Sequence, residues 1–275
     1  MKNRNLDGKK VSKEIIEEIK AYFEKHPTNK KLAIISVGDD YASSVYCNMK
    51  QKKCEYAHIS AIHIHFPETV TQQELENKII ELGKDQMVAG IMIQHPIPKH
   101  LDETSCFNLI PPEKDVDGLS AKSFGLIAQK RPIFVPATAL GIMTLLEKYK
   151  INLAGETVLM IGKSQIVGLP LSVMLMMAGA TVTVAHSRTK NLEALVKKHK
   201  IVIVAVGKPE LVKADWFKKG QIIVDAGYNE GNIGDVEKAA YEKAAYYTPV
   251  PGGVGPMTIA SLLQQTATAI KNLDK

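Results

Sequence analysis

The chain has 275 residues, of which 45% are hydrophobic, and it carries a formal net charge of +6. This length is enough for a sizeable core shared by two domains, whereas no apolar run is long enough to span a membrane and the N-terminus lacks the apolar core of a signal peptide, so we expect a cytoplasmic protein. The basic residues are mostly scattered lysines with few aromatic residues between them, which gives little support for nucleic-acid binding and fits an anionic small ligand or plain solubility equally well.

The first half of the chain alternates predicted strands with predicted helices. Three apolar runs are predicted as strands: Leu32–Val37, Ile59–Phe66 and Val88–Ile93. A helix is expected over Thr71–Gly83, where Thr71 and Glu74 have the spacing of a capping box. This alternation implies parallel βαβ units, in which ligands gather beyond the carboxyl ends of the strands. The loops that follow those ends are Gly38–Asp40, Pro67–Val70 and Gln94–Pro98.

The segment Tyr41–Cys54 has helical character and places Tyr46 and Lys50 one turn apart on one face. A phenol beside an ammonium suggests chemistry, because tyrosine offers a ring for stacking and lysine a proton whose affinity burial tunes. The same spacing is common on solvated helices, so the pair alone does not distinguish a functional site from a solvated helix face. The three cysteines lack paired spacing, so neither a disulfide framework nor a zinc site is expected, and Cys47 and Cys54 are interpreted as packing residues.

Two pairs of polar residues have several interpretations. Asp115 and Asp117 lie on the same side of the chain if their segment is extended, where they are able to bind a metal, orient a polar ligand or cap a turn at Gly118. His63 and His65 alternate with apolar residues and are expected to form the polar side of a half-buried strand. No third ligand is evident near them, so we predict no metal site.

The second half restarts the pattern of strands and helices. Strands are predicted over Thr157–Ile161, Thr181–Ala185, Val202–Val206 and Ile222–Asp225, and helices over Thr138–Tyr149, Leu169–Ala178 and Thr258–Leu273. We therefore expect an α/β protein with a cleft between two domains, an N-terminal α/β domain over residues 1–120 and a Rossmann-like parallel-sheet domain over residues 121–275. Whether the final helix, about residues 257–275, packs back on the first domain is left open.

A loop bordered by glycines, Gly162–Gly168, lies between a predicted strand and a predicted helix. Glycine lets the backbone approach an anion, and the helix N-terminus supplies N–H groups and the positive end of a dipole. The loop lacks the Gly-x-Gly-x-x-Gly spacing. A P-loop is excluded, because Thr157 rather than glycine stands five positions before Gly162.

The residues after the next predicted strand bear on the cofactor. Rossmann sites that prefer NAD place an acid there to bind the ribose hydroxyls. The turn His186–Thr189 contains no carboxylate, whereas Ser187 and Arg188 are able to receive a 2′-phosphate, and Lys163 offers a second cation. NADP is therefore favoured over NAD; the alternative is that Arg188 is simply solvated.

The segment Pro249–Thr258, PVPGGVGPMT, combines rigid prolines with three glycines directly before a predicted helix. In such a loop the glycine backbone, which has no side chains, is able to pack closely against a flat ligand, and the N-terminus of the following helix lies next to it. A functional interpretation is favoured over a structural hinge.

Six motifs, in one order over nearly the whole chain, resemble the bifunctional methylenetetrahydrofolate dehydrogenase/methenyltetrahydrofolate cyclohydrolase family. They are Val37-Gly38-Asp39…Ser43, Tyr46-x-x-x-Lys50-x-Lys52, Gln94-x-Pro96-x-Pro98, Lys114-Asp115-Val116-Asp117-Gly118, Gly162-x-Ser164-x-Ile166-Val167-Gly168-x-Pro170 and Pro249–Thr258. The last motif is highly specific, and six in sequence make coincidence improbable.

The resemblance implies that the N-terminal domain binds folate and carries the catalytic residues, and that the Rossmann-like domain binds NADP, with NAD possible. A hydride would pass from 5,10-methylenetetrahydrofolate to the nicotinamide, and the methenyl product would be hydrolysed to 10-formyltetrahydrofolate. Lys50 is implied as the acid/base of the hydrolysis, helped by Gln94. Tyr46 is implied to stack on the folate, and Asp117 to hydrogen-bond the pterin.

The remaining implied features concern the pocket, the cofactor and assembly. The folate pocket would be lined by Gly252 and Gly253. The cofactor positions of the family are matched by Gly162, Lys163, Ser164, Ser187 and Tyr228. The family also implies a homodimer formed through the Rossmann-like domains, tetrahydrofolate derivatives as partners, and a role in one-carbon metabolism and purine biosynthesis.

Four positions depart from the commonest family pattern. Lys163 stands where arginine is frequent, Ala137 replaces a cysteine, His95 an apolar residue and Tyr228 an isoleucine. Two other functions stay open. Another two-domain NADP dehydrogenase, acting on shikimate or an amino acid, does not explain the Pro249–Thr258 loop. A non-enzymatic dinucleotide-binding sensor leaves Lys50 without a purpose.

Overall fold

The computed structural model describes residues 4–274, and the chain divides into two compact units. The N-terminal unit comprises residues 14–137 and 259–274, and the C-terminal unit comprises residues 4–13 and 138–258. Near each end of the chain, the boundary between the two units falls inside a helix: α1 (Gly8–Lys25) at the N-terminal end and α9 (Val254–Leu273) at the C-terminal end. The expected division at residue 120, into a folate-binding domain over residues 1–120 and a Rossmann-like NADP-binding domain over residues 121–275, stays a prediction.

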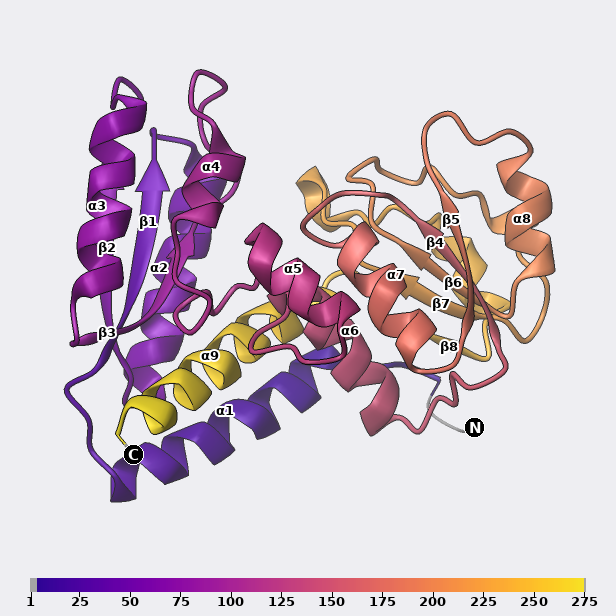
Figure 1. Ribbon diagram of the computed structural model, residues 1–275. Helices are drawn as coiled ribbons and strands as arrows, with labels where there is room; N and C mark the ends of the chain where they lie inside the picture. The colour runs from indigo at the N-terminus through magenta and orange to yellow at the C-terminus, as the bar shows by residue number, and fades with distance from the viewer. Residues whose placement is uncertain (1–3, 275) are drawn as a thin grey trace. The chain divides into compact units, whose positions relative to one another are not determined.

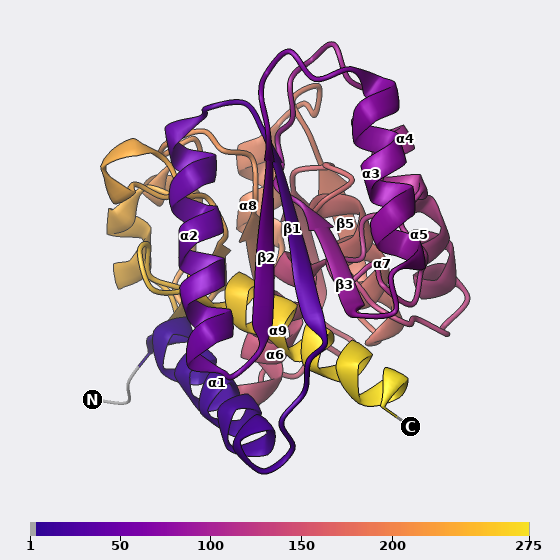
Figure 2. The same cartoon turned by 90° about the vertical axis from the view of Figure 1, so that its left-hand side faces the viewer.

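The N-terminal unit is built on a three-stranded parallel sheet with the strand order β2-β1-β3. Its strands are β1 (Lys31–Val37), β2 (Ser60–Phe66) and β3 (Val88–Ile93). Its further helices are α2 (Tyr41–Tyr56), α3 (Gln72–Lys84), α4 (Glu103–Asn108) and α5 (Ala121–Ala128). Figure 2 shows α2 and α3 on opposite sides of this sheet. Both faces of β1 are therefore covered, which explains why most of its residues are apolar.

The packing of α3 illustrates how the sequence produces this layer. Leu75, Ile79 and Leu82 are three or four residues apart and form one buried face against the core that contains Ala33 and Ile35. The predicted capping box is confirmed, because the Thr71 side chain accepts from the Glu74 backbone and the Glu74 carboxylate accepts from the Thr71 backbone. This reciprocal pair satisfies two of the N–H groups at the start of the helix.

The C-terminal unit contains a five-stranded parallel sheet with the order β5-β4-β6-β7-β8 (Figure 1). The strands are β4 (Thr157–Ile161), β5 (Thr181–Ala185), β6 (Ile201–Val204), β7 (Ile222–Asp225) and β8 (Tyr246–Tyr247). The helices are α6 (Ala137–Lys148), α7 (Gly168–Met177), α8 (Leu192–Lys198), η1 (Ala214–Trp216), η2 (Glu230–Asn232) and η3 (Lys238–Glu242). The chain reverses its direction across the sheet between β4 and β6, so the unit is doubly wound and has a switch point there. The expected Rossmann-like parallel sheet is confirmed.

Several elements were not predicted from the sequence. The helices α1, α4, α5 and α8 and the two-residue strand β8 are additional. The last helix begins at Val254, four residues earlier than expected, so it takes in half of the Pro249–Thr258 motif. The short helices depend on local caps: Asp102 accepts from the Ser105 backbone at the start of α4. Within residues 4–274, no helix has the length and apolar character needed to cross a membrane.

Candidate active site and dinucleotide-binding edge

Lys50 lies on α2 with its amine buried against the end of the N-terminal sheet. The residue is 8% exposed, and its Nζ donates to Gln94 Oε1 at 2.8 Å. Gln94 follows β3 directly, and its Nε2 donates to the His95 carbonyl at 2.9 Å, which orients the side-chain oxygen toward the lysine. Burial lowers the pKa of Lys50, because the charged ammonium loses its hydration.

Asp117 interacts electrostatically with the same lysine. Burial raises the pKa of Asp117 to about 6, and the positive charge of Lys50 opposes this shift. The carboxyl group of Asp117 in turn favours the ammonium form of Lys50 without reversing the effect of burial. Lys50, Gln94 and Asp117, which are far apart in sequence, are thus brought into one cluster within the N-terminal unit.

Two neighbours of Asp117 fix its loop: turn capping was one of the sequence interpretations of Asp115, whereas Lys114 was not recognised from the sequence as a support. Asp115 accepts from the backbone of Leu119 and Ser120 and from the Ser123 hydroxyl, so it is this aspartate that caps the turn and the start of α5. Lys114 is buried and its Nζ donates to the Asp85 carbonyl at 2.7 Å, at the C-terminal end of α3. The two aspartates therefore have different environments, and only Asp117 belongs to the cluster with Lys50 and Gln94.

Tyr46 precedes Lys50 by one helical turn and is half-buried. The neighbouring thiols of Cys47 and Cys54 are fully buried, as expected for packing residues. Burial raises the pKa of Cys54 to about 12, so this thiol stays protonated and unreactive near neutral pH.

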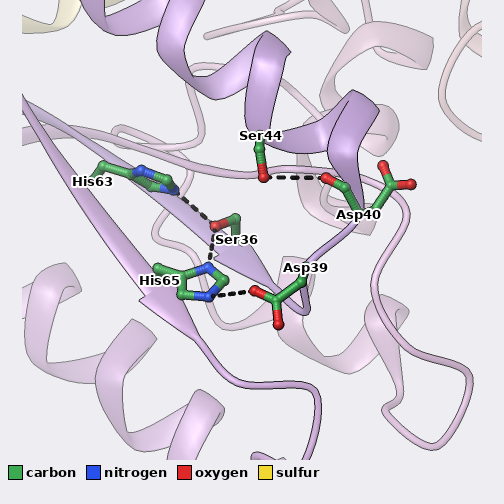
Figure 3. Close-up of polar contacts among 6 residues, drawn as sticks. All are labelled: Ser36, Asp39, Asp40, Ser44, His63 and His65. Carbon is green, nitrogen blue, oxygen red and sulfur yellow. Dashed lines mark hydrogen bonds and ion pairs between the residues drawn. The ribbon is translucent and has the colours of Figure 1, made fainter.

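Hydrogen bonds at the end of β1 fix the turn that leads into α2 (Figure 3). The Ser36 hydroxyl contacts His63 Nε2 at 2.7 Å and His65 Nδ1 at 3.1 Å, and His65 Nε2 lies 3.3 Å from the Asp39 carboxylate. Asp40 caps α2 by accepting from the Ser43 backbone at 2.7 Å. Among the residues that the structure describes, no group of three or more histidine, cysteine or acidic side chains is arranged to hold a metal ion.

In the C-terminal unit, the loop after β4 lies at the switch point of the sheet. Gly162 has φ of +123°, and a Cβ built on it would lie 2.3 Å from the Ala205 carbonyl oxygen, so only glycine fits. Ser164 Oγ accepts from the Val167 backbone at 3.1 Å, at the start of α7. Lys163 and Ser164 are exposed beside this bare backbone, an arrangement that fits the phosphates of a dinucleotide.

The remaining predicted cofactor residues follow the adjacent strands. Ser187 and Arg188 are exposed in a turn after β5 that is closed by a hydrogen bond from Thr189 N to the His186 carbonyl. Tyr228 follows β7, is 55% exposed and donates its hydroxyl to Asn232. All these residues therefore lie beyond the carboxyl ends of parallel strands, where doubly wound sheets bind their ligands.

Gly252 and Gly253 also belong to the C-terminal unit and shape the start of α9. Gly252 has φ of +107°, and its carbonyl accepts from the Lys9 backbone at 2.9 Å. A Cβ on Gly253 would lie 2.7 Å from the Pro249 carbonyl oxygen. Both glycines are thus required by the backbone, independently of any ligand.

The doubly wound sheet with a glycine-lined switch point defines an α/β protein of the dinucleotide-binding class. A second α/β unit contains the cluster of Lys50, Gln94 and Asp117. The chain belongs to the tetrahydrofolate dehydrogenase/cyclohydrolase family. The model of the family's catalytic domain matches residues 6–117, and that of its NAD(P)-binding domain matches residues 136–274.

Individual relatives cover almost the full length. A bifunctional protein FolD of Acidobacterium capsulatum is 45% identical over an alignment 272 residues long, which covers 96% of this chain and 96% of the relative. The solved structure of the FolD methylenetetrahydrofolate dehydrogenase/cyclohydrolase of Campylobacter jejuni has a TM-score of 0.93 and 42% identity, and covers 97% of this chain and 98% of its own. The FolD of Trypanosoma brucei, solved with NADP and an inhibitor, has a TM-score of 0.92 and 34% identity, and covers 97% and 96%.

Proposed function

We propose that this protein oxidises 5,10-methylenetetrahydrofolate to 5,10-methenyltetrahydrofolate with NADP, and hydrolyses the methenyl compound to 10-formyltetrahydrofolate. The observation that carries the proposal is the buried Lys50 amine, which is hydrogen-bonded to Gln94 and coupled to Asp117, in a chain of this family. The C. jejuni relative, named as both dehydrogenase and cyclohydrolase, supports the pairing of the two activities.

The hydrolysis requires a proton acceptor, because water loses a proton as its oxygen bonds to the iminium-like carbon. We assign this role to Lys50, since a lowered pKa gives more of the neutral amine at a given pH. The positive charge of the methenyl group favours that neutral form further. Gln94 holds the amine in place. The C–O bond forms, one C–N bond of the bridge breaks, and one proton in total is released.

The oxidation needs alignment rather than a proton relay. A hydride leaves the methylene carbon for the bound NADP, and that carbon becomes cationic. We assign Tyr46 to stacking on the folate and Asp117 to hydrogen-bonding the pterin's amino edge. Gly252 and Gly253 are assigned to the lining of the folate pocket.

We assign the dinucleotide to the carboxyl edge of the C-terminal sheet and favour NADP over NAD. The assigned residues are Gly162, Lys163, Ser164, Ser187, Arg188 and Tyr228. The absence of a carboxylate from the turn at residues 186–189 and the exposed Arg188 support NADP, because a 2′-phosphate needs a cation rather than an acid.

Replacing Arg188 tests this preference. Arg188→Ala is expected to raise the KM for NADP at least about tenfold, since a charge-assisted hydrogen bond is worth about 1.5–3 kcal/mol. The KM for NAD is expected to stay nearly constant, because NAD has no 2′-phosphate. Steady-state kinetics with both cofactors measure the two values, and equal changes would contradict contact with the 2′-phosphate.

We also propose a homodimer formed through the C-terminal unit. Leu169 and Met176 are 40% and 59% exposed and lie seven residues apart on α7, which places them on one helix face. Val184 on the edge strand β5 is 38% exposed. Such apolar exposure beside an unpaired strand edge fits a self-complementary interface. A cytoplasmic location and a contribution to purine biosynthesis are carried over from the family resemblance.

The decisive experiment is a cofactor-reduction assay with purified protein. NADP reduction is expected only when 5,10-methylenetetrahydrofolate is supplied, and the methenyl compound is expected to be hydrolysed faster than in buffer. Shikimate and amino acids serve as substrates for the alternative dehydrogenases. A dinucleotide-binding sensor would bind NADP but reduce none. Failure to reduce either NADP or NAD with the folate substrate would overturn the proposal.

A further inference from the structure

Two buried carboxylates lie beneath the loops at the carboxyl edge of the C-terminal sheet. Asp225 is the last residue of β7 and is 1% exposed, and Asp235 is fully buried. Neither side chain forms an ion pair with a cation among the described residues. Buried carboxylates of this kind are stable only where many hydrogen bonds offset the loss of hydration. The groups that donate these hydrogen bonds therefore show which segments of the chain each carboxylate holds in position.

Asp235 joins two loops that follow neighbouring strands. One oxygen, Oδ2, accepts from Val206 N at 2.6 Å and Gly207 N at 3.0 Å. The other oxygen, Oδ1, accepts from Lys208 N at 2.8 Å and from Asn229 Nδ2 at 3.1 Å. Three successive backbone N–H groups after β6 and one side chain after β7 therefore converge on a single carboxylate.

Asp225 holds Asp235 in turn. Its Oδ1 accepts from Asp235 N at 3.0 Å and Gly227 N at 2.9 Å, and its Oδ2 accepts from Val236 N at 3.0 Å. The packing around both carboxylates leaves no room for a side chain at the neighbouring glycines. A Cβ on Gly227 would lie 2.2 Å from Asp235 Cγ, and one on Gly234 would lie 2.0 Å from Asp225 Oδ2. The two carboxylates therefore form a rigid support under both loops.

Both supported loops border the place assigned to the dinucleotide. Ala205 begins the loop after β6, and its carbonyl oxygen faces Gly162 across the switch point. The loop after β7 contains Tyr228, beside Asn229. The support thus reaches two of the loops that line the crevice where doubly wound sheets bind their ligands.

We propose that Asp235 is a positioning residue for the dinucleotide: its carboxylate does not touch the cofactor but sets the backbone at residues 206–208 and the side chain of Asn229 so that the two loops match it. The inference rests on the proposed function for the identity of the dinucleotide. It adds a second group of residues, behind the cofactor loops, that determines the affinity for NADP.

Asp235→Asn is the informative change, because it keeps the shape but replaces one acceptor oxygen with a donor. In either orientation of the amide, its NH2 group faces at least one backbone N–H that Asp235 now binds, so donor meets donor. The loop after β6 is then expected to move away from its present position. We expect the Kd and KM for NADP to rise at least about tenfold, equivalent to about 1.4 kcal/mol.

The proposed hydrolysis of the methenyl compound uses no dinucleotide and so provides a readout within the same sample. A positioning role predicts that Asp235→Asn keeps the rate of this hydrolysis while losing affinity for NADP. The matched control is Glu237→Gln. Glu237 accepts from Ala214 N at 2.8 Å, at the start of η1, and among the described residues its side chain forms no hydrogen bond with either supported loop. The control is expected to keep the wild-type Kd for NADP.

The measurements are calorimetric titration with NADP and the rate of methenyl hydrolysis for each variant. If Asp235→Asn fails to fold, Asn229→Ala replaces it, with a smaller expected rise in Kd. An unchanged Kd, or an equal loss in the control or in the hydrolysis, would overturn the positioning role. Calorimetry does not require turnover, so a wild-type protein that binds NADP without oxidising folate refutes the proposed function while still testing Asp235. A wild-type protein that does not bind NADP refutes both.

Discussion

At the scale of single residues, the central feature is a lysine whose amine is kept out of water. Lys50 is buried beside a neutral amide and a carboxyl group whose own pKa is raised to about 6. Burial disfavours the charged form of both groups, while their mutual attraction favours it. Desolvation is the larger effect on each, so both tend toward the neutral state, which suits Lys50 to accepting a proton.

Replacing Lys50 separates the two proposed reactions. Lys50→Met is expected to lower the rate of methenyl hydrolysis by about 10²-fold or more, the usual contribution of a positioned acid or base. Part of the NADP-dependent oxidation is expected to survive, because hydride transfer needs no proton acceptor. The two rates are measured separately, by supplying the methenyl compound alone or the methylene compound with NADP.

Lys53 provides the matched control on the same helix. Its ammonium lies 5.9 Å from the centre of the exposed Tyr56 ring and has no contact with Gln94. Lys53→Met should leave both rates unchanged. Equal and small effects of Lys50→Met on the two reactions would show that Lys50 is not the proton-transfer group.

The pKa shifts also predict how stability depends on pH. In the folded protein Lys50 releases its proton below the ordinary lysine pKa of 10.5, so the unfolded chain binds more protons and the free energy of unfolding rises as pH rises toward 10.5. Asp117 has the opposite sign: the folded state binds its proton more tightly, so stability falls between the ordinary pKa of 3.8 and about 6.

Urea unfolding across the pH range measures both dependences. Lys50→Met is expected to remove the alkaline rise and Asp117→Asn the acidic fall, with about 1.4 kcal/mol for each unit of pKa difference. If a variant keeps the pH dependence of the wild-type protein in its own window, the burial of that group has been wrongly assigned.

At the scale of elements, the position of Lys50 depends on how α2 begins. Asp40 caps the helix through the Ser43 backbone, and the hydrogen bonds among Ser36, His63, His65 and Asp39 hold the preceding turn. A helix that frays at this end would loosen Tyr46 before Lys50, because Tyr46 lies one turn nearer the cap.

Two cap variants test this dependence. Asp40→Ala and Thr71→Ala each remove an N-cap, from α2 and α3 respectively, and each is expected to lower the melting temperature by a few degrees. Only Asp40→Ala is expected to raise the KM for the folate substrate, because α3 carries none of the assigned site residues. Similar changes in KM for both variants would contradict a local effect of the α2 cap.

The strands were predicted closely, and the reason lies in their burial. β3, β4, β5 and β7 have the predicted bounds, because parallel strands covered on both faces, or edge strands rich in threonine and valine, form short apolar runs that end at turn residues. The short helices α4 and α5 were missed, since six- and eight-residue helices give little periodicity and depend on caps and neighbouring contacts. The start of α9 was placed late, because Gly255 and Pro256 lie within its first turn.

At the scale of the whole molecule, the proposed dimer predicts the mass that the protein has in solution. Sedimentation should give twice the 30.2 kDa of one chain. Met176→Glu places a charge in the exposed apolar face of α7 and is expected to shift the protein toward monomer, because burying an unpaired charge in an interface is costly. Ile80→Glu, at a 37% exposed position on α3, is the control and should leave the mass unchanged. A monomeric wild-type protein would contradict the proposal.

The sequence by itself predicted the strands β1 to β7 and the helices α2, α3, α6, α7 and α9, and its motifs singled out the loops at Gly162 and Gly252 and the residues Lys50, Gln94 and Asp117, because these follow from apolar runs and short motifs. The residue pattern alone left Asp115 and Asp117 equivalent, only the family resemblance singled out Asp117, and nothing in the sequence indicated Asp235. Only the tertiary structure showed that Asp115 caps a turn while Asp117 lies near Lys50, and joined Lys50 to Gln94, 44 positions away. The physical reason is that pKa shifts and buried hydrogen bonds arise from desolvation, which depends on the distant segments that surround a group in the folded chain.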